Sequence, residues 1–286
     1  MIKIFTDTGA DYPYEVNNIR KIPLFYYFED NMNMQYGLDN HLSNKDFFCE
    51  LKKGRVPRTA SANIEITKDL FREELDKNND IICISVTSGL SSCYNNELIA
   101  AMELKEEYPD RRIEVIDSKI GSLPQALLAI KANTLVGGDY GFDNTIQFIE
   151  NNKLLYDYEI VLEDLIYPVR GGRVNAVLGN SLNKLKIKPL IRVDKNGKAV
   201  VNGMVRGTKK IEDRLINDAL DLGVDNVLEL GIVHSDNLER AIEFKEKILG
   251  MGIVEDVPIA EIGPAVGSYT GPNSLGLVTK RRVRRK

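Results

Sequence analysis

The sequence predicts an α/β protein of two domains: an N-terminal α/β domain built on a parallel sheet, residues 1–157, and a C-terminal α+β domain, residues 158–286. Short β-branched runs alternate with longer segments of helical period, which is the pattern of βα units around a largely parallel sheet. The length of 286 residues also favours about two domains. The chain has no internal repeat and no long linker, so we expect its two halves to pack closely.

The first half of the chain consists of alternating strands and helices. Its first strand, Ile2–Phe5, runs into the polar turn Thr6–Asp11, whose Asp and Thr side chains can bond nearby backbone groups. The further elements that we expect are a helix at Lys68–Lys77, a buried strand at Asp80–Val86, a helix at Ser92–Tyr108, a strand at Ile113–Ile116 and a helix at Ser122–Val136.

The second half of the chain begins with a hairpin signal. The Asn196-Gly197 pair lies in the turn Asp194–Lys198, which follows a strand-like run at Lys186–Ile191, and Asn-Gly strongly favours a hairpin. Two longer helices, Lys209–Leu222 and Asn237–Leu249, then alternate with strands at Val227–Val233 and Ala260–Ile262. This order predicts an α+β domain.

The charge distribution argues against nucleic-acid binding. The net charge is −4, and six of the seven residues Lys280–Lys286 are basic, so the rest of the chain carries about ten net negative charges. An acidic body repels nucleic acid, and no recognition motif accompanies the basic tail. The tail itself is either a solvated terminus or a segment that makes transient contact with an anionic membrane.

Metal sites, disulfides and membrane spans are also disfavoured. Cys49, Cys83 and Cys93 form no CxxC pair, and His41 and His234 are the only histidines. No apolar stretch reaches the roughly 18 residues of a membrane helix, and the first residues lead directly into a strand instead of a signal peptide. We therefore expect a cytoplasmic protein without a metal. Nucleotide-binding glycine loops and the GxSxG and HExxH motifs are absent as well.

Two loops rich in Ser and Thr are the candidate binding elements. The loop Thr87–Asn95 joins a buried strand to a helix, and the loop Arg58–Asn63 precedes another expected helix. Free backbone N–H groups and the positive end of a helix dipole converge at such loops, which suits a phosphate or a carboxylate. The alternative is that Ser91 or Ser92 only caps the helix that follows.

Eight short motifs occur in a fixed order along the chain, and in this order they resemble the DegV family of bacterial fatty-acid-binding proteins. The resemblance covers nearly the whole sequence. The motifs are Thr6-Asp7-Thr8, Thr59-Ala60-Ser61, Thr87–Tyr94, Asp117-Ser118, Asp164–Tyr167 with Gly171-Gly172-Arg173, Leu182–Pro189, Val205-Arg206-Gly207 and Tyr269–Pro272.

The resemblance implies that one long-chain fatty acid, such as palmitate, stearate or oleate, lies between the two domains. Its carboxylate would be held by hydroxyl groups and its tail would lie in an apolar tunnel, with no other cofactor and no catalytic residue. Neutral donors can satisfy a buried carboxylate, and each buried CH₂ contributes roughly 0.8 kcal/mol, so no charge partner is required. The implied ligand residues are Thr59, Ser61, Ser91, Ser92, Tyr269 and Thr270, of which Thr59 and Ser91 are the best candidates.

The sequence departs from the family pattern near the expected head group. Tyr269 stands where the family usually has His, and Ser92 and Cys93 stand where it has Gly and Thr. A phenol can donate a hydrogen bond but does not become a cation near neutral pH, so we expect head-group binding to depend little on pH. Cys93 is expected to be a buried small residue and not a nucleophile.

The resemblance also implies a protein partner. Arg173 and Arg206 lie in segments that it places on an exposed face, where arginines of the family are implicated in docking to a fatty acid kinase subunit. That kinase phosphorylates the bound acid and so provides acyl phosphate for phospholipid synthesis. The alternative is that both arginines are solvated or only stabilise glycine turns through ion pairs.

A different class of function stays open at this stage. The same loops could serve an enzyme that acts on a small phosphorylated or carboxylated metabolite, using them as an oxyanion or phosphate site. Such an enzyme needs a titratable group beside the loops, and Asp7 and Asp117 are the candidates that the sequence offers.

Overall fold

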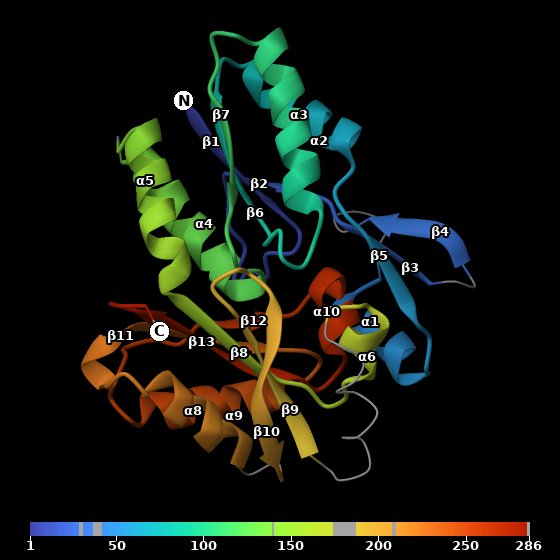
Figure 1. Cartoon of the computed structure of the whole chain (residues 1–286), viewed down its shortest axis with the longest axis vertical. Helices are drawn as coiled ribbons and strands as arrows, with labels where there is room; N and C mark the ends of the chain where they lie inside the picture. The colour runs from blue at the N-terminus through green and yellow to red at the C-terminus, as the bar shows by residue number, and fades with distance from the viewer. Residues whose placement is uncertain (29–30, 37–41, 139, 174–186, 208–209, 285–286) are drawn as a thin grey trace.

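The computed structural model of the chain describes residues 1–28, 31–36, 42–138, 140–173, 187–207 and 210–284. Their elements form three sheets with helices packed on them, and the N-terminal and C-terminal halves lie one above the other in Figure 1. The predicted α/β class is confirmed. The DegV-like run at Leu182–Lys186, His41, and Arg285 and Lys286 of the basic tail lie outside the described residues.

The N-terminal half is built on four parallel strands. Their order across the sheet is β2 (Ile19–Ile22), β1 (Ile2–Asp7), β6 (Asp80–Ser85) and β7 (Ile113–Asp117). The three expected strands of this half are thus present, and β2 adds a fourth. Because the strands are parallel, the loops that follow β1, β6 and β7 meet at one edge of the sheet.

Helices cover both faces of this parallel sheet (Figure 1). On one face, α2 (Ile64–Leu75) and α3 (Cys93–Glu107) pack on strand residues such as Phe5 and Cys83. On the other face lie α4 (Ser122–Gly137) and α5 (Phe142–Asn152), followed by a short 3-10 helix, Lys153–Leu155. The helix α2 begins before the expected Lys68 because the side chain of Asn63 accepts hydrogen bonds from the Glu65 and Ile66 N–H groups and caps it.

The C-terminal half is built on a six-stranded sheet. Its order is β10 (Ala199–Arg206), β9 (Ile187–Val193), β8 (Tyr156–Val161), β13 (Leu275–Arg281), β11 (Val227–His234) and β12 (Ile259–Glu261). All neighbours are antiparallel except β11 and β12. The sheet thus begins at Tyr156, and the division of the chain into domains at residues 157 and 158 stays a prediction.

The two faces of this second sheet belong to different cores. Side chains alternate along a strand, so Tyr158 and Ile160 of β8 pack with the first half, whereas Val161 packs with the helices of the second. These helices are α8 (Ile211–Ala219) and α9 (Leu238–Leu249), and a 3-10 turn, Val224–Asn226, precedes β11. One face of the sheet therefore remains for the junction between the halves.

A small third sheet lies beside this junction, and the sequence analysis did not foresee it. The strands β4 (Asn31–Tyr36), β3 (Phe25–Phe28) and β5 (Pro57–Ala60) pair in antiparallel order. The expected loop Arg58–Asn63 is therefore a strand up to Ala60, because Thr59 pairs with Tyr26 far away in the sequence. Three further helices complete the described elements: α1 (Asn44–Lys52), α6 (Ile166–Arg170) and α10 (Pro264–Thr270).

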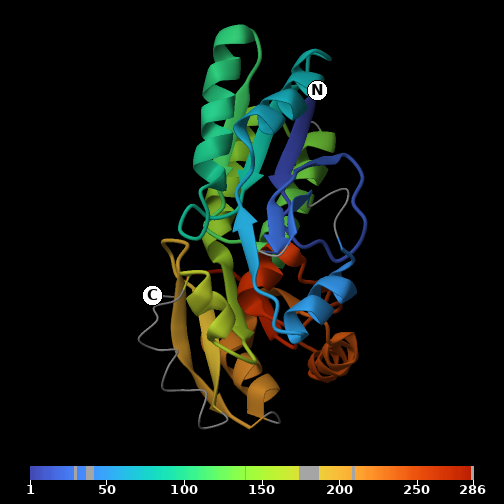
Figure 2. The ribbon, with the colours of Figure 1, turned by 90° about the vertical axis from the view of Figure 1, so that its right-hand side faces the viewer.

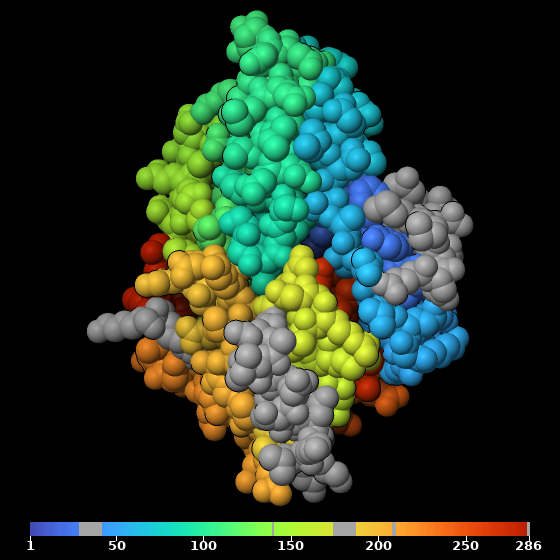
Figure 3. Space-filling view, turned by 45° about the vertical axis from the view of Figure 1, so that its right-hand side comes forward, coloured from blue at the N-terminus to red at the C-terminus, as the bar shows by residue number. Residues whose placement is uncertain are grey.

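The predicted hairpin of the second half is confirmed, and its tip contacts the first half. The strands β9 and β10 pair on either side of the expected turn, and Gly197 adopts φ 78° there. The Thr87 hydroxyl donates to the Gly197 carbonyl at 3.1 Å. A Cβ on Gly197 would lie 1.8 Å from Thr87 Oγ1, so only glycine fits. Figures 2 and 3 show this hairpin, in orange, rising to the lower edge of the N-terminal half.

The basic C-terminal run is not a continuous exposed tail, which corrects the sequence-based expectation. Lys280 and Arg281 are the last residues of β13 and are 7% and 1% exposed. Their burial follows from the pairing of β13 with β8 and β11, which extends to these positions. Among the described residues, Arg282 and Arg284 are the exposed basic residues of this run. Within the described part of the chain, no helix has both the length and the apolar composition that crossing a membrane requires.

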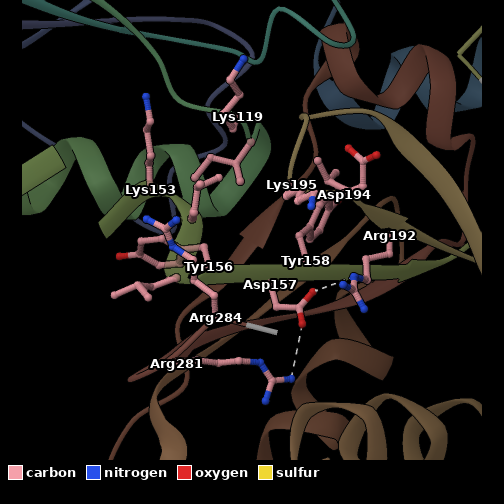
Figure 4. Close-up of a pocket in the computed structure, with 14 residues that line it drawn as sticks. Lys119, Lys153, Tyr156, Asp157, Tyr158, Arg192, Asp194, Lys195, Arg281 and Arg284 are labelled. Atoms are coloured by element: carbon pink, nitrogen blue, oxygen red, sulfur yellow. Dashed lines mark ion pairs between the residues drawn. The ribbon is translucent and has the colours of Figure 1, made fainter. Parts of the chain in front are cut away.

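Arg281 is held by several groups of the second half. Its guanidinium donates to the carbonyls of Ala219 and Asp218, each at 2.9 Å. It also pairs with Asp221 at 3.1 Å and with Asp157 at 3.4 Å. In Figure 4, Asp157 lies between Arg281 and Arg192. Arg281 thus joins β13 to β8 and to the end of α8.

We expect the substitution Arg281→Met to lower the free energy of unfolding by about 3 kcal/mol, because it leaves a buried carboxylate and two carbonyls with fewer partners. Urea unfolding monitored by circular dichroism measures this change. The matched control is Arg282→Met at the exposed neighbour, which should change the stability by less than about 0.5 kcal/mol. Equal, small effects of both substitutions would contradict the structural role of Arg281.

Candidate functional site

A cavity of about 360 Å³ lies at the junction of the two halves, and we call it the junction cavity. From the first half, it is lined by Gly9, Val86 and Gly121, which follow β1, β6 and β7 at one edge of the parallel sheet. From the second half, it is lined by β8 and β9. This position is where ligands usually bind to an open parallel sheet.

Most of the cavity wall is apolar. The strand β8 contributes every second side chain, because Tyr158, Ile160 and the following Leu162 point to the same side. The remaining apolar lining residues are Leu24, Ala60, Val86, Leu90, Pro168, Ile191, Val193, Ala199, Ala265 and Val266. Such a wall suits a hydrocarbon chain, which gains free energy roughly in proportion to the apolar area that it buries.

Eight residues with hydroxyl side chains line the same cavity; two are Ser122 and Tyr158, and the other six are those that the sequence analysis named. We call these six the hydroxyl cluster: Thr59, Ser61, Ser91, Ser92, Tyr269 and Thr270. They come from three segments: β5 with the residue after it, the loop before α3, and the end of α10. The structure thus brings together residues that are up to about 210 positions apart. Their role as carboxylate ligands stays a prediction.

Thr59 and Tyr269 connect the first and last of these segments. The Thr59 hydroxyl and the Tyr269 phenol form a hydrogen bond. Tyr269 lies in α10. The Thr270 hydroxyl next to it is buried and has no hydrogen-bond partner among the described residues. This part of the cluster therefore has an unsatisfied hydroxyl at the cavity wall.

The serines of the cluster form a second group. The Ser92 hydroxyl donates to Ser61 Oγ at 3.0 Å, and the amide of Asn96 donates to the same atom at 3.1 Å. Ser92 occupies the N-cap position of α3, but its side chain makes no capping bond. Ser91 Oγ instead accepts from the Cys93 N–H at 3.2 Å and contacts Cys93 Sγ at 2.8 Å. Ser91 therefore binds a backbone N–H group at the start of α3 and also lines the cavity.

Arg173 is half-buried and does not lie on an exposed face, which corrects the sequence-based expectation for its position, whereas its role in docking stays a prediction. Its side chain lines the junction cavity, where Nε donates to the Leu90 carbonyl at 3.0 Å and the guanidinium carbon lies 4.6 Å from the centre of the Tyr269 ring. A second guanidinium nitrogen of Arg173 donates to the Gly171 carbonyl at 2.5 Å. The sequence analysis did not foresee this cation beside the hydroxyl cluster. Arg206, in contrast, is exposed at the end of β10.

A second hollow of about 610 Å³ adjoins the hydroxyl cluster and shares Thr59, Tyr269 and Arg173 with the junction cavity. We call it the arginine hollow, because four arginines and no acidic residue line it: Arg55, Arg58, Arg170 and Arg173. Arg55 pairs with Glu50 at 2.8 Å, whereas Arg58 and Arg170 are exposed. The hollow therefore presents positive charge next to the place where a head group would lie.

The candidate bases of the enzyme alternative, Asp7 and Asp117, do not line the junction cavity. Asp7 is fully buried beneath it, and the N–H groups of Val86 and Gly9 donate to its carboxylate at 2.6 and 2.8 Å. Burial raises the pKa of Asp7, against the effect of these hydrogen bonds. Burial also acts to raise the pKa of Asp117, but bonds from Lys119 and Ser88 outweigh it and hold that pKa below its ordinary value. Both carboxylates thus fix loops, and neither is placed to act on a ligand.

Other titratable residues have structural roles as well. Cys93 and Cys83 are buried, and burial raises the pKa of both thiols. His234 Nδ1 accepts a hydrogen bond from the Asn237 N–H at 3.3 Å at the start of α9. Within the described ranges, no three His, Cys, Asp or Glu side chains are close enough to hold a metal ion.

Asp11 connects the two halves just behind the cavity wall. Its carboxylate accepts from the Ser122 hydroxyl and from the Gly263 N–H at 2.8 Å, so it joins the start of α4 to the start of α10. Burial raises the pKa of Asp11 from 3.8 to about 7, and the charges of Glu261 and Asp7 add to this rise, whereas the two hydrogen bonds oppose it. The sequence placed Asp11 only in a polar turn.

The chain resembles known proteins over almost its entire length. The model of the DegV family, whose members are described as uncharacterised, matches residues 1–282. A DegV domain-containing protein of Clostridium perfringens is 29% identical over 284 residues, which cover 96% of this chain and 95% of that relative. The family resemblance inferred from the motifs is confirmed.

Solved structures with the same fold carry fatty acids. A stearic-acid-binding protein of Eubacterium ventriosum is 24% identical, with a TM-score of 0.88 and coverage of 99% of both chains. A fatty-acid-binding DegV family protein of Thermus thermophilus is 21% identical, with a TM-score of 0.86 and coverage of 98% of this chain and 99% of that one. The Fak B3 protein of the Streptococcus pneumoniae fatty acid kinase, loaded with linoleic acid, is 19% identical, with a TM-score of 0.87 and the same coverage. At these identities the likeness establishes the fold.

We expect the raised pKa of Asp11 to make its contribution to stability depend on pH. Between its unfolded pKa near 3.8 and its folded pKa of about 7, the folded state holds the proton more tightly, so this contribution falls as the pH rises and levels off above about pH 7. Asp11→Asn removes the titration. As the pH rises from about 4.5 to about 8, the free energy of unfolding of the variant should therefore increase relative to that of the wild type, as measured by urea unfolding.

The control for this prediction is Asp143→Asn. The Asp143 carboxylate is exposed, and its hydrogen bond from Arg112 holds its pKa below the ordinary value. The shift of this pKa is therefore opposite in direction to the shift of the Asp11 pKa. The free energy of unfolding of this variant should not increase relative to that of the wild type as the pH rises over the same range. A wild type and an Asp11→Asn variant with parallel pH profiles would contradict the prediction.

Proposed function

The chain belongs to the DegV family, and on this premise we propose that it binds one long-chain fatty acid in the junction cavity. The carboxylate lies at the hydroxyl cluster and the acyl chain lies along the apolar wall formed by β8, β9 and α10. The single observation that carries this proposal is that the hydroxyl cluster, whose six members come from three distant segments, lines the same cavity as the apolar wall. The fatty acids bound in the solved relatives support it.

The energetics of such a complex are favourable. A carboxylate that leaves water loses several kcal/mol unless donors replace its hydration, and Ser, Thr and Tyr hydroxyls provide these bonds. Arg173 adds a cation beside the cluster, which the sequence-based argument did not include. Each buried CH₂ of the chain adds about 0.8 kcal/mol, so palmitate, stearate or oleate can be held mainly by the tail.

We infer further that the protein is a carrier and not a catalyst, and that it presents the bound acid to a fatty acid kinase subunit. The likeness to the Fak B3 protein supports this. The arginine hollow gives a physical reason, because positive charge beside the carboxylate attracts an acidic partner surface and the phosphates of a nucleotide. The acyl phosphate formed in this way would serve phospholipid synthesis. Contact of Arg282 and Arg284 with an anionic membrane would help delivery.

The proposed head-group ligands can be tested one at a time. Native mass spectrometry of the purified protein should show one adduct of fatty-acid mass. Thr59→Val keeps the shape of the side chain but removes its hydroxyl, and Ser91→Ala removes the second one. Each should weaken the binding of oleate by about tenfold or more, because a hydrogen bond to a charged group is lost.

Thr59→Ser is the matched control, since it keeps the hydroxyl and should bind oleate nearly as tightly as the wild type. Isothermal titration of delipidated protein measures all affinities. Unchanged affinity in both hydroxyl-deleted variants would remove the assignment of Thr59 and Ser91. A wild-type protein without an adduct that also fails to bind oleate would overturn the proposed function.

The proposed docking surface predicts a separate effect on phosphorylation. Arg170→Glu in the arginine hollow and Arg206→Glu at the end of β10 should each lower the rate of acyl-phosphate formation by about tenfold, because they replace attraction to the kinase by repulsion. Oleate affinity should not change, since neither side chain lines the junction cavity. The assay combines oleate-loaded protein, a fatty acid kinase catalytic subunit and ATP, and traps acyl phosphate with hydroxylamine.

Lys105→Glu, an exposed charge reversal on α3, is the control and should leave the rate unchanged. If the three variants are phosphorylated at the same rate, the kinase does not dock at the arginines. Saturation with higher kinase concentration distinguishes weaker docking from slower chemistry.

A further inference from the structure

The arginine hollow continues the junction cavity on the other side of the hydroxyl cluster. The two spaces share Thr59, Tyr269 and Arg173, which therefore form the boundary between them. At about 610 Å³ the hollow is within the usual size of a small-molecule site. A free fatty acid ends at its carboxylate, so an acid whose head group lies at the cluster does not occupy the hollow. A ligand that extends beyond the carboxyl carbon would enter it.

The lining of the hollow suits a phosphorylated nucleotide. Arg58 and Arg170 are exposed there, and a guanidinium group binds phosphate through two parallel hydrogen bonds. Two half-buried aromatic side chains, Tyr27 and Tyr167, line the same space, and such rings can stack on a nucleotide base. These residues come from β3, β5 and α6, and α10 packs against all three elements (Figure 1). Phosphate-binding and base-binding side chains are thus gathered in one recess.

The described carboxylates beside the hollow are engaged by protein groups. No acidic residue is among the described residues that line it. Glu50, outside the lining, pairs with Arg55 at 2.8 Å. Asp164, whose charge acts on Tyr167, accepts a hydrogen bond from the Ile166 N–H at 2.8 Å. The arginines of the lining therefore give the hollow an excess of positive charge.

The hydroxyl cluster does not require a free carboxylate. Its members are neutral donors, and a hydroxyl can donate to a thioester carbonyl as well as to a carboxylate. A neutral carbonyl also loses less hydration free energy than a carboxylate when it enters the cavity. Arg173, the cation at the boundary, already donates to the carbonyls of Leu90 and Gly171. The other arginines lie beyond the position of the acyl carbonyl, which suits a ligand whose negative charge is displaced from that carbonyl.

We propose that the junction cavity and the arginine hollow together bind a long-chain acyl thioester whose thiol carries a phosphorylated nucleotide, which is the chemistry of an acyl-coenzyme A. The acyl chain lies in the junction cavity, the thioester carbonyl accepts from the hydroxyl cluster, and the phosphates lie among the arginines. The chain from Thr59 back to Arg55 lines the hollow and spans up to about 13 Å if it is extended, so a flexible arm has room between carbonyl and phosphates. This inference rests on the proposed function for the position of the acyl chain, and it adds a second class of acyl ligand.

Titration of delipidated protein with three ligands tests the proposal. The ligands are oleate, oleoyl-pantetheine, which has the thioester but no phosphate, and oleoyl-coenzyme A. The last should bind about tenfold or more tightly than oleoyl-pantetheine, because its phosphates pair with arginines. This difference should shrink as the salt concentration rises, since the pairs are exposed to solvent. Oleate should displace oleoyl-coenzyme A, because both acyl chains occupy the junction cavity.

Two variants assign the effect to the hollow. Arg58→Glu and Arg170→Glu should each reduce the preference for oleoyl-coenzyme A over oleoyl-pantetheine to about twofold or less, because attraction to the phosphates is replaced by repulsion. Neither side chain lines the junction cavity, so oleate affinity should keep its wild-type value, which also shows that the variants are folded. Lys105→Glu, the exposed charge reversal on α3, is the matched control and should keep the full preference.

The outcomes separate this inference from the proposed function. If oleate binds and oleoyl-coenzyme A binds no more tightly than oleoyl-pantetheine, the proposal is overturned, because the hollow then contributes nothing. If the preference is the same in the wild type and in both arginine variants, the phosphates lie elsewhere and the assignment to the hollow is wrong. If none of the three ligands binds, the proposed function fails together with the inference.

Discussion

The packing of one face of β8 against the edge of the parallel sheet is the constraint on which the site depends. The side chains of Tyr158 and Ile160 belong to the same core as Ile4 and Ile82 of the first half, so the two sheets share a single apolar interior. The loops after the parallel strands occupy this edge and keep the sheets apart. Because interiors are close-packed, the space that the two layers leave unfilled is well defined, and it becomes the junction cavity.

Each kind of polar group lies where its hydrogen bonds or its charge can be satisfied. Fully buried carboxylates lie behind the wall and are held by the loops themselves, as Asp7 is by the N–H groups of Val86 and Gly9. Neutral hydroxyls lie at the surface of the cavity, where they can bond a ligand at a lower cost of desolvation than a charged group. Positive charge lies beside the hydroxyl cluster, where Arg173 lines the cavity, and in the adjoining arginine hollow. The arrangement suits a molecule with one anionic end and a long apolar body.

Much of the fold follows from local pattern. Periodicity indicated the strands β1, β6 and β7, the helices that alternate with them, and the hairpin whose turn contains Asn196 and Gly197. The errors have a common cause. The strand β5 exists only because Thr59 pairs with the distant Tyr26, and Arg281 is buried only because β13 lies between β8 and β11. From sequence alone, basic and hydroxyl-rich segments are predicted to be exposed, because the long-range strand pairing that buries them is not known.

The sequence by itself determined the α/β class and the family, and it singled out six hydroxyl residues that line the cavity, because short motifs and hydrophobic period are local properties of the chain. Only the tertiary structure decided how these residues meet. It placed Arg173 beside Tyr269 instead of on an exposed face, and it connected Asp11 to both halves. Proximity and burial depend on the packing of distant segments, and no local pattern encodes them.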